Sequence, residues 1–508
     1  MVATPVLLGI DLGTSSVKAV LTDRLGMPLA EAVAEYRVSH PRPGWAQSKP
    51  LDWWSATRSA VREVMTKSPG AQAISGGPIA IGLSGQMHGV VLARADGEPV
   101  GDAVLWADSR ALAELELYRA LPEVVRARLA NPLSPGMAGP ILAWFARHEP
   151  AAPAEADLAL QPKDWLRLML TGIAHGEPSD ASATLLQAVT GGGTAVESWD
   201  ADVVRGLGLN PNLLPPLLFG SGAPAGALTP GAAEQLGLTP GIVVAAGAGD
   251  TPAAALGSGL TEAGEVQLSI GTGVQIVTPS ALAPVPSLDP VTHHYRSALS
   301  LGASRAGYYR MAAGLNGGLA LSWVREMLNA SWGELYACAE QPPSATAPIF
   351  LPHLAGERTP YLDASMRGAW INLAPEHTRA DLMRAALEGV AFGAADAFDA
   401  LFPTGSRPGQ VRLAGGGTLA PAWRQLLADV LDVDLLPVSV TGASARGAAL
   451  LGAQAAGLLD EAELVDVARA GAADVGERVT PRRAETSALA ARRTLFLEAT
   501  ALLRQDRE

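Results

Sequence analysis

The sequence predicts a mixed α/β protein of two similar domains, and two observations support this prediction. First, segments 6–14 and 265–273 each contain a short apolar run that ends in a Gly-Thr turn, and a second apolar run follows each turn. The two turns, Gly13-Thr14 and Gly271-Thr272, are separated by about half of the 508-residue chain. Second, segments with helical spacing alternate with apolar strands in both halves, which is typical of α/β folds. We therefore expect each domain to open with a β-hairpin whose turn can hold a phosphate.

The first half of the chain contains further predicted helices and strands. Segment 17–22 completes the first hairpin, and apolar residues from Trp53 to Met65 recur at helical spacing. Segments 78–83 and 242–246 are apolar runs of strand length. We expect both to be strands.

The boundary between the two domains is predicted where small residues precede the second hairpin, at 257–261. This boundary divides the chain into an N-terminal domain, residues 1–257, and a C-terminal domain, residues 258–508. Segment 274–278 completes the second hairpin. A site that uses both hairpin turns therefore needs one turn from each domain.

The second half also contains predicted helices and strands. Thr378 and Asp381 fit a capping box, which predicts the start of a helix. Segment 411–414 predicts a strand that breaks into three glycines, with a helix from about Pro421. The charged segment 484–508 predicts a terminal amphipathic helix. Both halves are therefore mixed α/β.

Composition limits the classes of function. The chain has 37 Lys and Arg against 50 Asp and Glu, a net charge of −13, so no basic surface for nucleic acid or an anionic membrane is expected. A single cysteine, Cys338, excludes an intramolecular disulfide and favours a reducing cytoplasm. Segment 1–5 has no basic leader, and no stretch approaches the ~18 apolar residues of a membrane helix. We expect a cytoplasmic protein with no nucleic-acid or membrane partner.

The two hairpin turns and a glycine cluster are candidate phosphate and nucleotide sites. The turn from Asp11 to Ser16 offers backbone N–H groups, hydroxyls and one carboxylate, which can surround phosphate oxygens and hold Mg²⁺. Alone, this turn is also compatible with an ordinary hairpin, and no Walker A lysine follows it. The second turn, 271–273, favours a phosphate clamp split between the domains. The cluster 415–417 is either a tight strand–helix turn or a close approach to a nucleotide.

Asp250 is the most conspicuous carboxylate in the sequence. It follows the apolar segment 242–249 and therefore stands at the C-terminal end of a predicted buried strand. Ligands of α/β folds bind at this end of the sheet, and a carboxylate there is suited to act as a general base for a substrate hydroxyl. The alternative is a purely structural role as the N-cap of helix 251–256.

A second polar turn follows the strand at 78–83. It places Gln86, Met87 and His88 together. An amide and an imidazole can bind the hydroxyls of a sugar, and the thioether can form an apolar wall. A structural histidine is the alternative. Trp106 lies after the next strand and extends the same surface, and no histidine has the spacing of a zinc site.

Taken in order, these motifs resemble those of the FGGY carbohydrate kinases, and within that family those of the xylulokinases. The resemblance extends from about Val6 to about Gly457. The Gln86-Met87-His88-Gly89 element favours xylulokinases over glycerol, ribulose or gluconate kinases. The matching motifs are Gly9-Ile10-Asp11-Leu12-Gly13-Thr14-Ser15-Ser16-Val17-Lys18, Gly44-Trp45, Trp53-Trp54, Gly82-Leu83-Ser84-Gly85-Gln86-Met87-His88-Gly89, Pro162-Lys163-Asp164-Trp165-Leu166, Gly249-Asp250, Ile270-Gly271-Thr272, Gly356-Glu357-Arg358-Thr359-Pro360, Arg384-Ala385-Ala386-Leu387-Glu388-Gly389 and Gly415-Gly416-Gly417.

The resemblance implies two actin-like, ribonuclease-H-like domains with an interdomain cleft, sugar against the first domain and ATP mostly against the second. It implies that Asp250 is the catalytic base and that Asp11 lies beside Mg²⁺. It places Met87 and His88 at the sugar, Thr14, Gly271 and Thr272 at the phosphates, and Gly318, Gly416 and Gly417 at the nucleoside. Together with the motifs above, the candidate sugar-binding residues are Gln86, Met87, His88, Trp106, Asp250 and Thr251, and the candidate phosphate- and nucleotide-binding residues are Thr14, Ser15, Gly271, Thr272, Gly318, Gly416 and Gly417. Gly318 is assigned by the resemblance alone.

Four positions differ from the xylulokinase pattern. Thr251 and Ala107 each replace an asparagine, Ile141 replaces a lysine and Asn372 replaces a glycine. The first two bear on the sugar pocket. The sequence therefore predicts an ATP- and Mg²⁺-dependent kinase that converts D-xylulose to D-xylulose 5-phosphate. The alternatives are a kinase of another ketose or polyol, an actin-like ATPase and a non-catalytic sugar-binding regulator, and a homodimer is left open.

Overall fold

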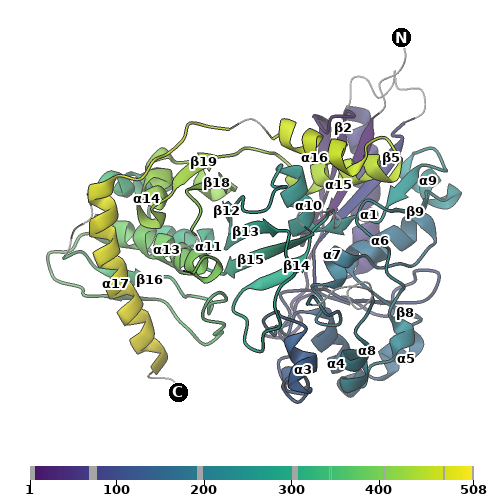
Figure 1. The fold of residues 1–508 in the computed structure, drawn as a ribbon, viewed down its shortest axis with the longest axis horizontal. Coiled ribbons are helices and arrows are strands. Elements are labelled where there is room, and N and C mark those ends of the chain that lie inside the picture. Colours follow the sequence, from purple (N-terminus) through teal and green to yellow (C-terminus); the bar gives the residue numbers. More distant parts are fainter. Residues whose placement is uncertain are drawn as a thin grey trace, which may run out of the picture.

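The computed structural model describes residues 6–67, 77–190, 198–299, 307–342, 344, 346–403, 407–472 and 475–505. Segment 1–5, on which the expectation of no leader depends, and residues 506–508 of the expected terminal helix lie outside this part. Figure 1 shows two lobes, with the N-terminal half of the chain in one lobe and most of the C-terminal half in the other.

Each lobe is built on one large sheet, and the two sheets share a topology. In the described residues, the N-terminal sheet has the order β3-β2-β1-β5-β10-β9, with β11 beside β5, and the C-terminal sheet has the order β14-β15-β13-β12-β18-β19. In both sheets the first strand of the hairpin pairs antiparallel with the second and parallel with a later strand. The prediction of two similar α/β domains that open with hairpins is therefore confirmed.

The N-terminal sheet consists of β1 (Leu7–Leu12), β2 (Ser16–Thr22), β3 (Pro28–Glu35), β5 (Ala80–Gly85), β9 (Pro224–Ala227), β10 (Val243–Ala245) and β11 (Ala248–Gly249). Short strands of the same lobe are β4 (Gln47–Ser48), β6 (Val91–Ala93), β7 (Ala103–Val104) and β8 (Leu158–Leu160). Its helices are α1 (Pro50–Lys67), α2 (Leu115–Arg119), α3 (Glu123–Ala127), α4 (Ala138–His148), α5 (Ala151–Glu155), α6 (Pro162–Thr171), α7 (Pro178–Ala181), α8 (Ala201–Gly206), η2 (Pro211–Leu213), α9 (Pro230–Leu236) and α10 (Asp250–Gly257).

The C-terminal sheet consists of β12 (Gln267–Ile270), β13 (Val274–Ser280), β14 (His293–Arg296), β15 (Tyr308–Gly314), β18 (Gln410–Ala414) and β19 (Asp434–Pro437), and a separate pair is β16 (Ile349–Leu351) with β17 (Ala369–Ile371). The helices of the second half are α11 (Gly318–Met327), α12 (Trp332–Ala337), η3 (Cys338–Glu340), α13 (Arg379–Leu401), η4 (Gly416–Thr418), α14 (Pro421–Leu431), α15 (Ala443–Ala455), α16 (Glu461–Ala470) and α17 (Arg483–Gln505). The capping box at Thr378 and Asp381, the helix at Pro421 and the terminal helix are all confirmed.

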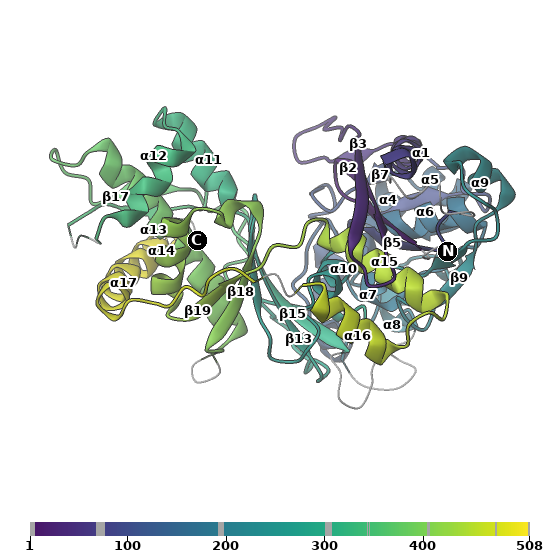
Figure 2. The same cartoon turned by 90° about the horizontal axis from the view of Figure 1, so that it is seen from above.

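The two faces of the N-terminal sheet are covered differently because the strand residues alternate. Leu8 and Ile10 of β1 point to the face of α1 and α6, where Trp53 and Trp165 are fully buried. The opposite face carries Gly9 on β1 and Gly82 on β5, and α15 lies directly on it. Figure 2 shows α15 and α16, which come from the end of the chain, within the N-terminal lobe.

α15 approaches the sheet so closely that side chains are excluded. A Cβ atom at Gly82 would lie 1.6 Å from the carbonyl oxygen of Ala448, and one at Gly9 would lie 1.9 Å from that of Ala445. Gly257 of α10 makes a similar approach to Ala443. Backbone therefore packs on backbone, and the sheet strands that carry the candidate site are fixed against a helix from the far end of the sequence.

Gly82→Ala is expected to lower the free energy of unfolding by about 1–3 kcal/mol or more, because the added methyl group forces α15 away from the sheet. The matched control is Gly231→Ala in α9, where a Cβ atom has nothing within 4 Å. That control is expected to melt at or slightly above the wild-type temperature, since alanine favours a helix over glycine by roughly 0.5–1 kcal/mol. Thermal melting of the two variants checks this. Equal melting temperatures would contradict the close packing.

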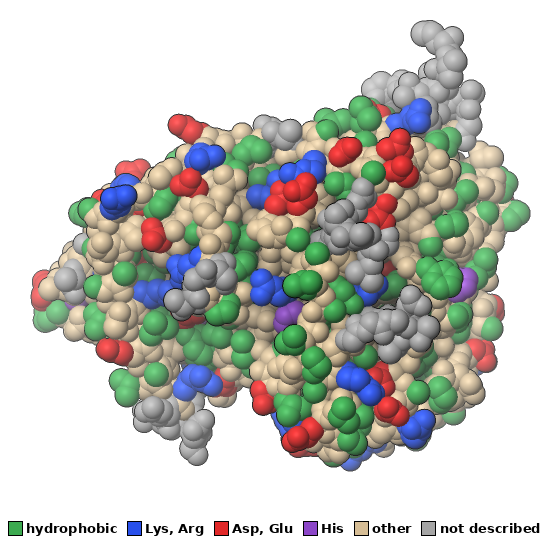
Figure 3. Space-filling view, in the orientation of Figure 1, with side chains coloured by type: hydrophobic (Ala, Val, Ile, Leu, Met, Phe, Trp, Pro, Cys, Tyr) green, Lys and Arg blue, Asp and Glu red, His purple; other side chains and the backbone are tan. Residues whose placement is uncertain are grey.

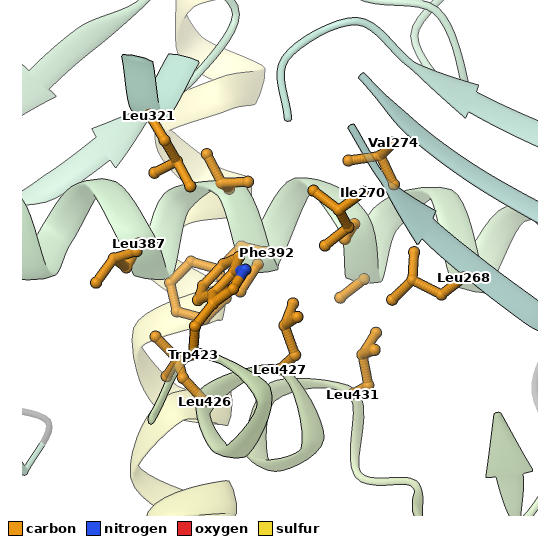
Figure 4. Close-up of a cluster of buried hydrophobic side chains, with 14 of the residues drawn as sticks. Leu268, Ile270, Val274, Leu321, Leu387, Phe392, Trp423, Leu426, Leu427 and Leu431 are labelled. Atoms are coloured by element: carbon orange, nitrogen blue, oxygen red, sulfur yellow. The ribbon is translucent and has the colours of Figure 1, made fainter. Parts of the chain in front are cut away.

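The core of the C-terminal lobe joins the elements that carry its three glycine turns. Figure 4 shows Ile270 and Val274 of the hairpin close to Phe392 of α13, with Leu321 of α11 and Leu427 of α14 in the same cluster. Gly271 follows β12, Gly318 begins α11, and Gly416 precedes α14. One apolar core therefore sets the relative positions of these glycines.

Charged side chains of both signs lie on the surface. On the face shown in Figure 3, Lys and Arg side chains are interspersed with Asp and Glu. Within the described ranges, none of the helices has the length and apolar character needed to cross a lipid bilayer. The only cysteine, Cys338, is a buried thiol.

Candidate active site

Three strands of the N-terminal sheet end side by side and bring the candidate residues together. Asp11 pairs with Ser84 across the parallel strands β1 and β5, and Gly249 of β11 pairs with Gly85. The predicted strand 242–246 is interrupted, because Gly247 adopts a φ of +80° and the chain resumes in β11. Asp250 therefore begins α10 beside the end of β5.

Asp11 is held inside the first hairpin. Its Oδ1 accepts a hydrogen bond of 2.8 Å from the hydroxyl of Ser84. Burial raises the pKa of Asp11, and the Ser84 hydrogen bond and the charge of Lys18 oppose this rise. The carboxylate is thus oriented by one donor and has acceptor capacity left for a ligand.

Asp250 has the pKa expected of a base that works near neutral pH. Burial raises its pKa to about 7, and the negative charge of Asp11 contributes further to the rise. Its Oδ1 accepts hydrogen bonds from the backbone N–H of Thr251 at 2.6 Å and from the Thr251 hydroxyl at 3.3 Å. The alternative of Asp250 as an N-cap is wrong, because Gly249 occupies the N-cap position and Asp250 is already the first helical residue.

Thr251 is linked to the other lobe. Its hydroxyl oxygen accepts a hydrogen bond of 3.1 Å from Nε2 of Gln275 on β13. The same amide nitrogen lies 3.1 Å from the sulfur of Met311. Gln275 was not predicted as a site residue, because only the folded chain brings β13 beside α10.

The side chains of the turn after β5 have different contacts. Gln86 is 1% exposed, and its Nε2 donates to the carbonyl oxygen of Gly13 at 3.3 Å, so this amide supports the hairpin turn. Met87 packs on Gly249, where a Cβ atom would lie 2.7 Å from its Cγ. The hydroxyl of Tyr309 from the C-terminal lobe donates to the Met87 sulfur at 3.8 Å.

His88 is a neutral imidazole with one free acceptor. Its Nδ1 lies 2.7 Å from the carbonyl oxygen of Ala183, so Nδ1 carries the proton and Nε2 keeps its lone pair. Burial lowers the pKa of His88 to about 4, and the charge of Arg358 adds to this effect. The backbone of His88 adopts a left-handed φ of 74° in this turn. The imidazole is therefore suited to accept a hydrogen bond from a hydroxyl.

The first hairpin turn also binds the side chain of Trp106. The indole N–H of Trp106 donates to the hydroxyl of Thr14 at 3.0 Å. Tyr36 donates from its hydroxyl to the carbonyl oxygen of Gly13, and its backbone N–H donates to that of Ser15. The turn that contains Thr14 and Ser15 is thus held by hydrogen bonds from Trp106 and from Tyr36.

The predicted nucleotide residues of the C-terminal lobe line one cavity of about 750 Å³. Gly318 N–H donates to the carbonyl oxygen of Gly271 at 2.8 Å, which joins α11 to the second hairpin turn. A Cβ atom at Gly271 or Gly416 would have nothing within 4 Å and would extend into open space. The residues around the cavity are Gly271, Thr272, Gly318, Leu319, Ser322, Trp323, Glu326, Trp332, Tyr336, Gly416, Gly417 and Leu419.

The cavity has an aromatic wall that was not predicted. The rings of Trp332 and Tyr336 stack at 5.5 Å, and Trp323 is 37% exposed. Glu326 adds one carboxylate. A pair of aromatic residues four apart in a short helix was visible in the sequence, but its exposure toward a cavity depends on how α12 folds onto α11.

The carboxylates of Asp11 and Asp250 fit a divalent cation. The charge of Asp11 raises the pKa of Asp250, so the two groups repel each other, and a cation would relieve that repulsion. Among the described residues, no cluster of three or more His, Cys, Asp or Glu is arranged for a metal ion. Mg²⁺ would therefore need phosphate oxygens and water as further ligands, which is its usual mode of binding.

Comparison with known proteins gives matches over both lobes. Residues 6–257 match the N-terminal domain of the FGGY family of carbohydrate kinases, and residues 266–456 match its C-terminal domain. The xylulose kinase of Klebsiella pneumoniae is 34% identical over 431 residues, which are 84% of this chain and 85% of that protein. The glycerol kinase of Ralstonia nicotianae is 30% identical over 447 residues, 85% of each protein. The crystal structure of a "xyloylose kinase" from Brucella ovis has a TM-score of 0.88 at 32% identity and covers 98% of this chain and 99% of that one.

Proposed function

The chain belongs to the FGGY family of carbohydrate kinases and is a sugar kinase, and we propose that it transfers the γ-phosphoryl group of ATP to the terminal hydroxyl of D-xylulose. The products would be D-xylulose 5-phosphate and ADP. The observation that carries this proposal is Asp250, a carboxylate with a pKa of about 7 at the edge of a sheet, beside Asp11 and the turn of Met87 and His88. The name of the Klebsiella relative supports the choice of xylulose.

Asp250 would act as the general base of the transfer. Phosphoryl transfer needs an aligned acceptor, charge neutralisation and a group that takes the hydroxyl proton as the new O–P bond forms. A carboxylate whose pKa is near neutral is half ionised at pH 7 and still basic enough to accept that proton. The two Thr251 hydrogen bonds to Oδ1 leave Oδ2 of Asp250 for the hydroxyl.

Asp11 and the two hairpin turns would serve the phosphates. Mg²⁺ held by Asp11 would neutralise charge on the transferred phosphoryl group. Backbone N–H groups and the hydroxyls of Thr14, Ser15 and Thr272 would donate to phosphate oxygens. Gln86 and Trp106 would keep the first turn in position, because both side chains bond to it.

The sugar would lie against the turn of Met87 and His88. Nε2 of His88 is the acceptor for a sugar hydroxyl, and Met87 and Trp106 provide apolar surface. Thr251 is engaged by Asp250 and Gln275 and has no amide to offer the sugar. This favours a second candidate within the same family, a kinase of another ketose or of a polyol.

Initial rates with ATP and Mg²⁺ over a panel of pentuloses, hexuloses and polyols, glycerol included, test the proposed function. The highest kcat/KM is expected for D-xylulose. A far higher value for another sugar would contradict the choice of xylulose and leave the kinase assignment intact. Sugar-independent ATP hydrolysis with no transfer to any acceptor would instead favour the actin-like ATPase. A reducing cytoplasm is the proposed compartment, since the single cysteine cannot form an intramolecular disulfide.

The nucleoside would bind in the 750 Å³ cavity, with its base against the aromatic wall of Trp332 and Tyr336. Gly416→Val is therefore expected to raise the KM for ATP by roughly tenfold or more, because the new side chain enters the cavity. The KM for sugar should change little. Gly409→Val is a control, since a Cβ atom there also meets nothing within 4 Å but lies outside the residues around the cavity. An unchanged KM for ATP in Gly416→Val would contradict this nucleotide site.

A further inference from the structure

Arg358 of the C-terminal lobe faces the candidate sugar site from the opposite lobe. Its guanidinium carbon lies 5.3 Å from the ring centroid of Trp106, a residue of the N-terminal lobe. Trp106 is itself bonded to Thr14 of the first hairpin. The contact therefore spans the boundary between the lobes at the place where the sugar and phosphate residues meet.

The loop that carries Arg358 is held firmly by its neighbours. The carboxylate of Glu357 accepts hydrogen bonds from the backbone of Leu315 at 2.8 Å, from the amide of Asn316 at 2.9 Å and from the backbone of Arg358 at 2.9 Å. Thr359 N–H donates to the carbonyl oxygen of Ala313 at 3.0 Å. The loop is thus fixed to the end of β15, and the position of Arg358 is set before a ligand arrives.

Within the described part of the chain, no salt bridge reaches the Arg358 guanidinium. Burial lowers the pKa of Arg358 and the negative charge of its neighbour Glu357 opposes this effect, but the hydrogen bonds of that carboxylate go to the donors described above. Buried arginines elsewhere have hydrogen-bond partners: Arg384 and Arg492 both bond Glu388, at 2.7 Å and 2.6 Å, and Arg446 bonds backbone carbonyl oxygens. Arg358 is half-buried. A cation that is partly removed from water without a partner is costly, so such groups are found where a ligand supplies the partner.

The charge of Arg358 acts on the histidine of the candidate sugar turn. This charge lowers the pKa of His88 and of His293, and the His88 ring lies 5.8 Å from that of Tyr295. Asp250 is instead influenced by Asp11, at the phosphate hairpin. A guanidinium that donates and an imidazole nitrogen that accepts are complementary partners for adjacent oxygens of a sugar.

We propose that Arg358 is a sugar-binding residue, supplied by the C-terminal lobe, that donates hydrogen bonds to oxygens of the sugar beside Trp106. This inference rests on the proposed function as a sugar kinase. Because Arg358 and His88 belong to different lobes, a sugar bound by both joins the lobes and is held only when they are together. Arg358 is thereby a determinant of sugar choice that belongs to the C-terminal lobe.

Arg358→Met tests the proposal. The KM for sugar, and its dissociation constant by calorimetry, should rise by ~10–100-fold, the range expected for losing hydrogen bonds from a charged donor. The KM for ATP and the rate of sugar-independent ATP hydrolysis should stay within about threefold of wild type. The matched control is Arg367→Met, an exposed arginine that bonds only carbonyl oxygens of its own loop, and its KM values should be unchanged. An unchanged sugar KM in Arg358→Met, or a rise confined to ATP, would overturn the proposal.

A second variant distinguishes a loss of sugar binding from a loss of folding. Added guanidinium chloride at low concentration should restore sugar binding to Arg358→Ala, whereas a purely structural defect would not respond. If Arg358→Ala melts at the wild-type temperature and guanidinium does not restore its sugar binding, the proposal is overturned. The acceptor in these assays is the sugar that the wild type phosphorylates fastest. The Arg358 variants can therefore be compared with the wild type even if that sugar is not D-xylulose. If no sugar is phosphorylated, the proposed function fails, and the calorimetric comparison still decides the role of Arg358.

Discussion

Asp250→Asn is expected to lower kcat by roughly 10²–10⁴ while sugar and nucleotide still bind. Asparagine keeps the shape of the side chain and an oxygen that can accept the two Thr251 hydrogen bonds, at 2.6 Å and 3.3 Å in the wild type. It removes only the group that takes the proton of the sugar hydroxyl. Steady-state kinetics and calorimetric titration with sugar and with ADP measure the two effects separately.

The pH dependence of the wild type provides a second readout of the same base. Asp250 must be ionised to accept a proton, and its pKa is about 7, so kcat/KM should fall as the pH falls through about 7. The folded-state pKa lies above 3.8, the ordinary pKa of an aspartate, so the folded protein holds this proton more tightly than the unfolded chain does. Stability conferred by this group is therefore present below pH 3.8 and lost as the pH rises through about 7. Asp250→Asn should accordingly melt at or above the wild-type temperature at pH 8.

Asp429→Asn is the matched control for Asp250→Asn. Asp429 is a fully buried carboxylate that lies in α14 and accepts hydrogen bonds from Arg482 and Gln425. Its loss should lower the melting temperature and leave kcat unchanged. A near-normal kcat in Asp250→Asn, or a loss of activity that follows a loss of folding as in the control, would show that Asp250 is only a structural residue.

The local features of the site could be predicted from the sequence because they depend on neighbours in the chain. The Gly-Thr turns, the strand before Gly415 and the helix start at Thr378 all follow from short-range patterns, and each is present. Asp250 could be singled out because an apolar run precedes it. The sheet then places it beside Asp11, as the ends of parallel strands require.

The contributions from the other lobe could not be predicted, because no local pattern encodes them. Gln275 reaches Thr251, and Arg358 reaches Trp106, only when the two lobes are assembled. The return of α15 to the N-terminal sheet depends on glycines at Gly9 and Gly82, whose need for space is apparent only once their partner helix is known. Which residues of the two lobes come into contact therefore depends on burial and charge pairing in the folded chain, and hydrophobic periodicity does not predict it.

Asp11→Asn is expected to lower kcat by roughly 10²-fold at limiting Mg²⁺, and raising Mg²⁺ should restore part of the loss, because the substitution weakens the metal site without removing the base. The same defect should appear in sugar-independent ATP hydrolysis, since Asp11 lies in the phosphate hairpin rather than at the sugar turn. Binding of Mn²⁺ in the presence of ADP, followed by its magnetic resonance signal, measures the metal site directly and should weaken.

Asp11→Asn should also lower the pKa of Asp250. This effect distinguishes Asp11→Asn from the other variants described above. The negative charge of Asp11 helps to raise the pKa of Asp250, so its removal lowers that pKa. The acid limb of the kcat/KM profile at saturating Mg²⁺ should therefore move to lower pH than in the wild type. Ser84→Ala is the comparison, because it removes the hydrogen bond that lowers the pKa of Asp11 and keeps the carboxylate itself. If the acid limb of Asp11→Asn stays in place and added Mg²⁺ restores nothing, Asp11 acts neither on the metal nor on the base.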